Sequence, residues 1–293
     1  MGKKVAFIGS GGAVKGVAHL GALRALEALD LRPSIFVGAS AGALVNALYA
    51  QGVTVDTMLG WLDSDKRPHD PNALAFRHFV GLPSLRQLSA PGYLTSGLLS
   101  LDRFERFLAH RLPSNDFASL DQDLLITAAD IDGRGRAVFG KGYIESVTIS
   151  QAVAASCCVP LLFRPYEIGG RYYIDGEVVR TLSLDLAVEA GAEVVVISNV
   201  YRAHVTRGRE RSLVFKGAAA VGRQSLNMML SEKEKRGIDL LHRLYPNVEF
   251  VNVSADLGAF PFLSQRRVRD IVRRGYREAL RVLRAAERSG VFA

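Results

Sequence analysis

A turn of small residues between an apolar run and a helical pattern constrains the fold most. Apolar residues 35–37 lead into Gly38-Ala39-Ser40-Ala41-Gly42, and an Ala/Leu-rich segment with helical spacing follows up to Gly52. This is the nucleophile-elbow pattern, in which a sharp strand-to-helix turn exposes a serine side chain. Glycines two positions before and after the serine allow the strand and the helix to approach closely. Ser40 is therefore a candidate nucleophile, with its amide at a helix N-terminus.

A second strand–loop–helix unit precedes the elbow. Residues 4–8 predict a short buried strand, Gly9-Ser10-Gly11-Gly12 follows, and a helical pattern covers residues 14–29. The order strand, helix, strand, helix predicts a parallel βαβ unit. Both loops then lie at the carboxyl ends of their strands, where open α/β sheets place their sites. We expect an α/β fold with a central, mostly parallel sheet flanked by helices.

The remaining chain predicts one main unit over residues 1–200 and an extension over 201–293 that packs on it. Residues 54–120 carry five of the ten prolines and few strand signals, which predicts a helical insertion or lid with a helix at 102–110. Between 124 and 197 we expect two hairpins, two helices and a buried strand. The extension predicts a basic loop at 201–211, two helices, a strand at 248–253 and a final helix.

Composition excludes several classes of protein. Hydrophobic residues make up 48% and charged residues 23% of the chain, as in ordinary globular proteins. The two cysteines, Cys157 and Cys158, are adjacent, so they argue against a disulfide-built fold and a zinc site. No apolar run is long enough to span a membrane, and no signal-peptide pattern is present. We expect a cytoplasmic protein. No acidic cluster has the spacing of calcium ligands, and we expect neither metal nor cofactor.

The net charge of +8 is concentrated near the end of the chain. Between Ser264 and Gly290 there are nine arginines and three acidic residues. The arginines recur every three or four residues opposite an apolar stripe, which predicts an amphipathic helix. A solvated face is the simpler interpretation, and peripheral contact with an anionic membrane is the sharper one. No nucleic-acid motif accompanies the charge, so no nucleic acid is expected.

The glycine-rich loop at residues 9–16 has three possible functions. A Walker loop needs Gly-Lys-Ser/Thr, but Val14 precedes Lys15 here. A dinucleotide fingerprint needs Gly or Ala at position 14 and an acidic ribose ligand, and both are missing. An oxyanion hole remains, in which backbone amides face the tetrahedral oxyanion formed when Ser40 attacks a carbonyl. Considered alone, the loop fits a packing turn about equally well.

Ser40 needs a base to accept its proton. An ordinary Ser-His-Asp esterase would use His204 or His242, while His19 is expected to be structural. Asp175 is better placed, because it closes a predicted strand and is followed by Gly176. A carboxylate base requires a desolvating pocket that raises its pKa.

Together these motifs resemble the bacterial patatin-like phospholipases. The resemblance rests on the loop with Lys15-Gly16, the elbow at Ser40 and the pair Asp175-Gly176, supported by residues 155–160 and 185–195. It implies a patatin-like three-layer fold with residues 1–200 as the catalytic domain. It also implies hydrolysis of carboxylic ester bonds of phospholipids or other lipids through an acyl-enzyme. The implied site comprises Ser40 as nucleophile, Asp175 as base, the amides of Gly11, Gly12 and Ala13 as oxyanion hole, and Lys15, Gly16, Gly38, Gly42 and Gly176 as supporting residues.

Two residues depart from the family pattern. Ala13 replaces the third loop glycine, and its Cβ is expected to narrow the oxyanion hole. Glu177 replaces the Gly or Ala after Asp-Gly and places a second carboxylate near the dyad, which either raises the pKa of Asp175 or points to solvent. A catalytically degenerate lipid- or partner-binding protein of the same fold therefore stays open beside the hydrolase.

Overall fold

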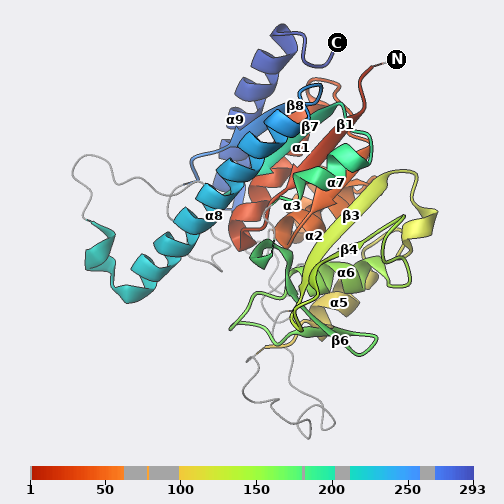
Figure 1. Ribbon diagram of the computed structural model, residues 1–293, viewed down its shortest axis with the longest axis vertical. Coiled ribbons are helices and arrows are strands. Elements are labelled where there is room, and N and C mark those ends of the chain that lie inside the picture. The colour runs from red at the N-terminus through yellow and green to blue at the C-terminus, as the bar shows by residue number, and fades with distance from the viewer. Residues whose placement is uncertain (1, 63–77, 79–98, 180–181, 202–211, 258–267) are drawn as a thin grey trace, which may run out of the picture.

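The computed structural model describes residues 2–62, 78, 99–179, 182–201, 212–257 and 268–293 (Figure 1). Its centre is an eight-stranded sheet in the order β5-β6-β3-β2-β1-β7-β8, with β4 paired to β3. The strands are β1 (Val5–Gly9), β2 (Ile35–Gly38), β3 (Asp123–Asp130), β4 (Gly135–Phe139), β5 (Tyr166–Ile168), β6 (Arg171–Asp175), β7 (Val194–Asn199) and β8 (Glu249–Ser254).

Five neighbouring strands of this sheet run parallel. β3, β2, β1, β7 and β8 pair in parallel, whereas β4 and β6 run antiparallel to β3, and β5 runs antiparallel to β6. The expected α/β fold with a central, mostly parallel sheet is confirmed. The carboxyl ends of the five parallel strands share one edge of the sheet, and the loops after β1 and β2 both leave from it.

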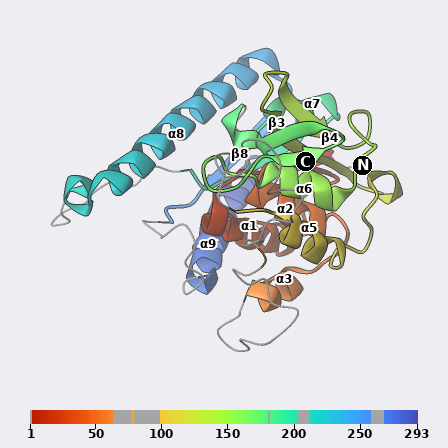
Figure 2. The same ribbon diagram turned by 90° about the horizontal axis from the view of Figure 1, so that it is seen from below.

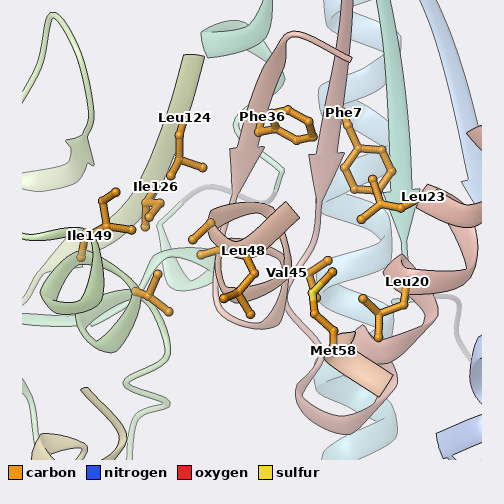
Figure 3. Packing of buried hydrophobic residues seen from close by; sticks show 14 of the residues in the cluster. Phe7, Leu20, Leu23, Phe36, Val45, Leu48, Met58, Leu124, Ile126 and Ile149 are labelled. Atoms are coloured by element: carbon orange, nitrogen blue, oxygen red, sulfur yellow. The ribbon is translucent and has the colours of Figure 1, made fainter. Parts of the chain in front are cut away.

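Helices cover both faces of the sheet, because the side chains of each strand alternate between the faces. Phe7, Phe36 and Ile126 face one layer, where they pack with residues of α1, α2, α6 and α9 (Figure 3). Ile8 and Val37 face the opposite layer with α7 and α8. The helices are α1 (Ala18–Glu27), α2 (Ala41–Tyr49), α3 (Val55–Leu62), α5 (Asp102–Ala109), α6 (Ile149–Ser156), α7 (Leu184–Glu189), α8 (Ala218–Leu244) and α9 (Val268–Arg288).

Helix α9, near the end of the described chain, packs on α1, near its beginning. A Cβ atom on Gly21 would lie 2.2 Å from the Val272 carbonyl oxygen, and one on Gly275 would lie 2.5 Å from the Ala18 carbonyl oxygen. Glycine on both helices therefore lets the two backbones touch. The apolar face of α9 is buried, and the arginine face is exposed, as the amphipathic pattern predicts.

The segment after β7 differs from the expectation of two helices. One 27-residue helix, α8, runs from Ala218 to Leu244, and a 3₁₀ turn, Leu213–Lys216, precedes it. A glycine inside a helix costs only about 1 kcal/mol, so Gly222 and Gly237 do not end it. The N-terminal half of α8 projects beyond the rest of the molecule (Figures 1 and 2).

Only part of the expected insertion at 54–120 belongs to the described residues. The helix expected at 102–110 is present as α5, and α3 contributes Met58 to the core. Residues 63–77 and 79–98 lie outside the described residues, so the lid stays a prediction. The first helix, expected from residue 14, begins as a 3₁₀ turn, Ala13–Val17, before α1. Within the described ranges, no helix has the length and apolarity needed to cross a bilayer.

Candidate active site

Ser40 lies in the turn between β2 and α2, in a conformation unusual for a residue with a side chain. Its φ is 53° and its ψ is −122°, a combination that costs a non-glycine residue of order 1–3 kcal/mol. The amide of Ser40 donates to the Ser156 hydroxyl oxygen at 2.7 Å, and this hydroxyl donates to the Thr127 carbonyl oxygen at 2.7 Å. Ser156 therefore ties the strained turn to β3. Its role was not predicted, because only the fold brings α6 to the turn.

Close contacts between backbones explain the small residues of the two motifs. A Cβ atom on Gly42 would lie 2.1 Å from the Gly9 carbonyl oxygen, so α2 can sit on the end of β1 only with glycine there. A Cβ atom on Gly176 would lie 2.3 Å from the Thr127 carbonyl oxygen. Gly16 and Gly38 are equally crowded, against Ala41 and Ala43.

Asp175 closes β6 at the same edge of the sheet and is 6% exposed. One carboxylate oxygen accepts the Glu177 amide at 3.0 Å, and the Ser40 hydroxyl is a further hydrogen-bond partner. Burial raises the pKa of Asp175 to about 6, and the two hydrogen bonds lower it by less. The structure thus brings the predicted nucleophile and the predicted base into contact. Ser40 and Asp175 are distant along the chain, and the pairing of β6 with β3 brings them together.

A thiol also contacts Ser40. The Cys157 side chain is a hydrogen-bond partner of the serine hydroxyl. Burial, and then the charge of Asp175, raise the pKa of Cys157 well above its usual range. Because the thiolate is the reactive form of cysteine, this thiol does not compete as a nucleophile.

The glycine-rich loop after β1 approaches Ser40 directly. A Cβ atom on Gly11 would lie 3.2 Å from the Ser40 Cβ. Gly12 has a φ of 142°, and Ala13 has a φ of 48°, so the alanine adopts a left-handed conformation that favours glycine. The amides of Gly12 and Ala13 have no hydrogen-bond acceptor among the described residues. The loop that approaches Ser40 at Gly11 therefore carries two donors that can bind an oxyanion.

Glu177 points inward rather than to solvent. It is 5% exposed, and its Oε1 accepts the Gly11 amide at 2.7 Å. Burial, followed by the charge of Asp175, raises the pKa of Glu177 well above its usual range. The second carboxylate thus lies near Asp175, and the solvent-facing alternative is wrong. The expected rise in the pKa of Asp175 comes from burial and not from the charge of Glu177, whose backbone amide lowers it.

Two of the histidines considered as bases lie away from Ser40. His19 is fully buried between the Ser198 hydroxyl, at 2.7 Å, and the Ser10 carbonyl oxygen, at 2.8 Å, and burial lowers its pKa to about 4. His242 is exposed on α8 and packs on Phe250, at the amino end of β8, which is the opposite edge of the sheet. His204 lies outside the described residues.

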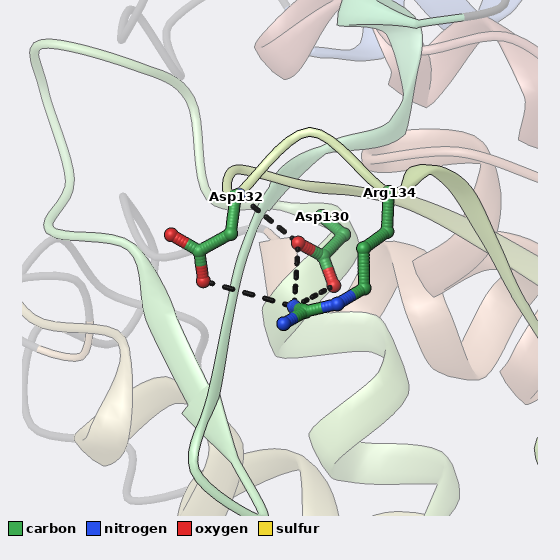
Figure 4. A network of polar contacts seen from close by, with 3 residues as sticks. All are labelled: Asp130, Asp132 and Arg134. Carbon is green, nitrogen blue, oxygen red and sulfur yellow. Dashed lines mark hydrogen bonds and ion pairs between the residues drawn. The ribbon is translucent and has the colours of Figure 1, made fainter.

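The turn between β3 and β4 stabilises the neighbouring end of the sheet (Figure 4). Arg134 Nη1 lies 3.0 Å from Asp130 Oδ2 and 3.8 Å from Asp132 Oδ2. Burial raises the pKa of Asp130, but the hydrogen bonds from Arg134 and the Asp132 amide outweigh it, and the pKa is lowered. Asp130 pairs with Tyr173, two residues before Asp175, so this network lies beside the strand that carries the carboxylate. In the part of the chain that the structure describes, no group of three or more His, Cys, Asp or Glu side chains is arranged to hold a metal ion.

Comparison with known proteins identifies the family. The family model described as "Patatin-like phospholipase" matches residues 9–188, which hold the glycine-rich loop, the elbow and Asp175. The uncharacterized protein YqhO of Bacillus subtilis is 28% identical over 188 residues, which cover 58% of this chain and 62% of YqhO. The probable lipid hydrolase 463L of Invertebrate iridescent virus 6 is 25% identical over 191 residues, which cover 61% of this chain and 62% of that protein.

A solved structure extends the likeness to the fold. The chain is similar to VipD from Legionella pneumophila, with a TM-score of 0.53, 14% sequence identity and coverage of 97% of this chain and 67% of VipD. At this identity the likeness concerns the fold alone. The chain spans 62% of the length of each of the two curated relatives. Since the family match covers more than half of the sequence, the chain belongs to the patatin-like phospholipase family.

Proposed function

We propose that the protein is a serine acyl hydrolase that cleaves carboxylic ester bonds of phospholipids or other lipids. The observation that carries this proposal is the contact between the Ser40 hydroxyl and the buried Asp175 carboxylate, whose pKa burial raises to about 6. A carboxylate with this pKa is mostly ionised at neutral pH, yet is basic enough to accept the serine proton in the transition state. Membership of the patatin-like phospholipase family supports a lipid as the substrate.

The proposed reaction has two steps. In the first, Asp175 takes the proton from the Ser40 hydroxyl while the serine oxygen attacks the ester carbonyl, and the free loop amides bind the oxyanion. Collapse of the tetrahedral intermediate breaks the ester bond, and the leaving alcohol takes the proton from Asp175. In the second step Asp175 accepts a proton from water, and the resulting hydroxide attacks the acyl-enzyme. This releases the fatty acid and returns the proton to Ser40.

The two proposed catalytic residues are largely shielded from solvent. Ser40 is 5% exposed and Asp175 is 6% exposed. We propose that residues 54–120 form a helical insertion or lid of a catalytic domain at 1–200, with 201–293 as an extension that packs on it. The cytoplasmic location and the membrane contact of the arginine-rich face of α9 stay predictions.

Substitution of the two side chains tests the proposal. Ser40→Ala and Asp175→Asn should each abolish fatty-acid release from a short-chain ester or a phospholipid, while circular dichroism shows the fold intact. Full turnover by Ser40→Ala would contradict the assignment. Loss of activity in His204→Ala with retention in Asp175→Asn would instead indicate a Ser-His-Asp esterase.

The low exposure of Ser40 and the left-handed conformation of Ala13 favour one alternative, a binding protein of the same fold without activity. A fluorophosphonate probe separates the two functions, because it labels only an activated serine with an accessible oxyanion hole. Labelling of wild type that is lost in Ser40→Ala supports the hydrolase. A folded wild-type protein that is not labelled supports the binding protein.

A further inference from the structure

The Glu177 side chain connects two parts of the proposed site. It belongs to the 3₁₀ turn Gly176–Val178, directly after Asp175, and its Oε1 binds the Gly11 amide at 2.7 Å. Its second oxygen, Oε2, is buried and has no hydrogen-bond partner among the described residues. Burial of a carboxyl group with one unpaired oxygen costs free energy. We therefore expect its remaining hydrogen bond, from the loop amide, to have a role. The bond joins the turn of the base to the oxyanion loop.

Gly11 lies in a crowded position with no room for a side chain. A Cβ atom there would be 2.4 Å from the Tyr201 hydroxyl oxygen, 2.8 Å from the Glu177 Cγ and 3.2 Å from the Ser40 Cβ. The next two residues carry the amides that have no acceptor. A shift of Gly11 would therefore move these amides relative to Ser40.

We propose that Glu177 is a positioning residue for the proposed hydrolysis. It holds the oxyanion loop through the Gly11 amide and leaves the amides of Gly12 and Ala13 to the substrate oxygen. This rests on the proposed function, since it assigns Glu177 a part in that reaction. The Glu177 backbone amide donates to the Asp175 carboxylate, whereas the hydrogen bond of its side chain goes to the Gly11 amide. The proposed role of the side chain is therefore exerted through the loop.

The charge state of this group follows from its neighbours. The groups that face it are the Gly11 amide, Asp175 on its own turn, Tyr201 after β7, and Lys233 and Glu234 on α8. Burial first, and then the charge of Asp175, raise the pKa of Glu177, while the Gly11 amide and Lys233 lower it by less. Burial and an ionised Asp175 both disfavour the charged form of Glu177. In either form Oε1 can accept the Gly11 amide, as the geometry shows. Glutamine has the same shape and acceptor and carries no charge.

Three variants test this. Glu177→Leu, which keeps the volume and loses the acceptor, should lower kcat about 10- to 100-fold and change KM by less than about 3-fold, because the loop amides bind mainly the transition state. Glu177→Gln should keep kcat within about 3-fold and leave the acid limb of the pH profile in place. Glu234→Gln is the matched control, since Glu234 is also buried but binds Asn199 instead of the loop. It should leave kcat unchanged.

Hydrogen exchange gives a readout that does not depend on activity. In protein labelled with ¹⁵N-glycine, the Gly11 amide should exchange at least about 10-fold faster in Glu177→Leu than in wild type, and at the wild-type rate in Glu177→Gln. Wild-type kcat in Glu177→Leu overturns the proposal, as does a fall in kcat without faster exchange at Gly11. A Glu177→Gln variant as impaired as Glu177→Leu also overturns the proposal. If Glu177→Leu does not fold, the kcat of Glu177→Gln alone decides the test, and a kcat well below that of wild type overturns the proposal. Failure of the proposed function is seen separately, in wild type compared with Ser40→Ala, before Glu177 is changed.

Discussion

Replacing Asp175 with asparagine should stabilise the protein at neutral pH while abolishing hydrolysis. Burial raises the pKa of Asp175 from 3.8 to about 6, so the folded state binds this proton more tightly than the unfolded state. Between pH 3.8 and about pH 6, the free-energy cost of ionising the buried Asp175 carboxyl group in the folded state grows with pH. A shift of this size corresponds to about 3 kcal/mol of lost stability at pH 7 and to almost none below pH 4.

Urea unfolding of wild type and Asp175→Asn between pH 4 and pH 8 measures this effect. The free energy of unfolding of the variant should exceed that of wild type by up to about 3 kcal/mol at pH 7, and the difference should vanish near pH 4. Titrating groups that do not interact with Asp175, such as His19, affect both proteins equally and cancel in the difference. The same pKa predicts that kcat/KM of the wild type falls about 10-fold per pH unit below pH 6. A variant that is equally stable at both pH values, or a flat activity profile down to pH 4.5, would refute the reasoning.

Three further outcomes are expected. Ser156→Ala should lower kcat about 10- to 100-fold with little change in KM, because Ser40 loses the acceptor of its amide; an unchanged kcat in a steady-state assay would contradict this. Gly275→Ala should cost about 1–3 kcal/mol in urea unfolding through its contact with α1, while Gly237→Ala, with open space around it, should cost nothing. Charge reversal at Arg273, Arg277 and Arg281, on the exposed face of α9, should weaken binding to anionic liposomes. Unchanged binding would contradict the predicted membrane contact.

Much of the sheet could be predicted from the sequence, because buried strands and tight turns leave local patterns. The elbow at Ser40 and the loop at Gly11 lie in strand–loop–helix units whose order alone places them at one edge. Asp175 could be proposed from its place at a strand end, but its distance from Ser40 depends on the antiparallel pairing of β6 with β3. Propensity carries no information on such pairing.

The contacts that support the site could not be predicted. Ser156 binds the Ser40 amide from another helix, and a serine in a helix of small residues carries no periodic signal that distinguishes it. The inward direction of Glu177 is likewise set by the Gly11 amide, which is distant along the chain. The prediction of two helices after the basic loop is wrong, because the single helix α8 continues through Gly222 and Gly237.

The packing of α9 on α1 affects how the protein can fold while it is synthesised on the ribosome. α1 follows the glycine-rich loop directly, and its glycine face is covered by α9, roughly 250 residues further along the chain. At about 5–20 residues per second, the emerging chain carries Ser40 for roughly 10–50 s before α9 is made. During that interval the helix that follows the loop has no partner for this face. The face of α1 that follows the glycine-rich loop therefore stays uncovered until α9 has been made, so this part of the core is completed only after β8 and α9 are available.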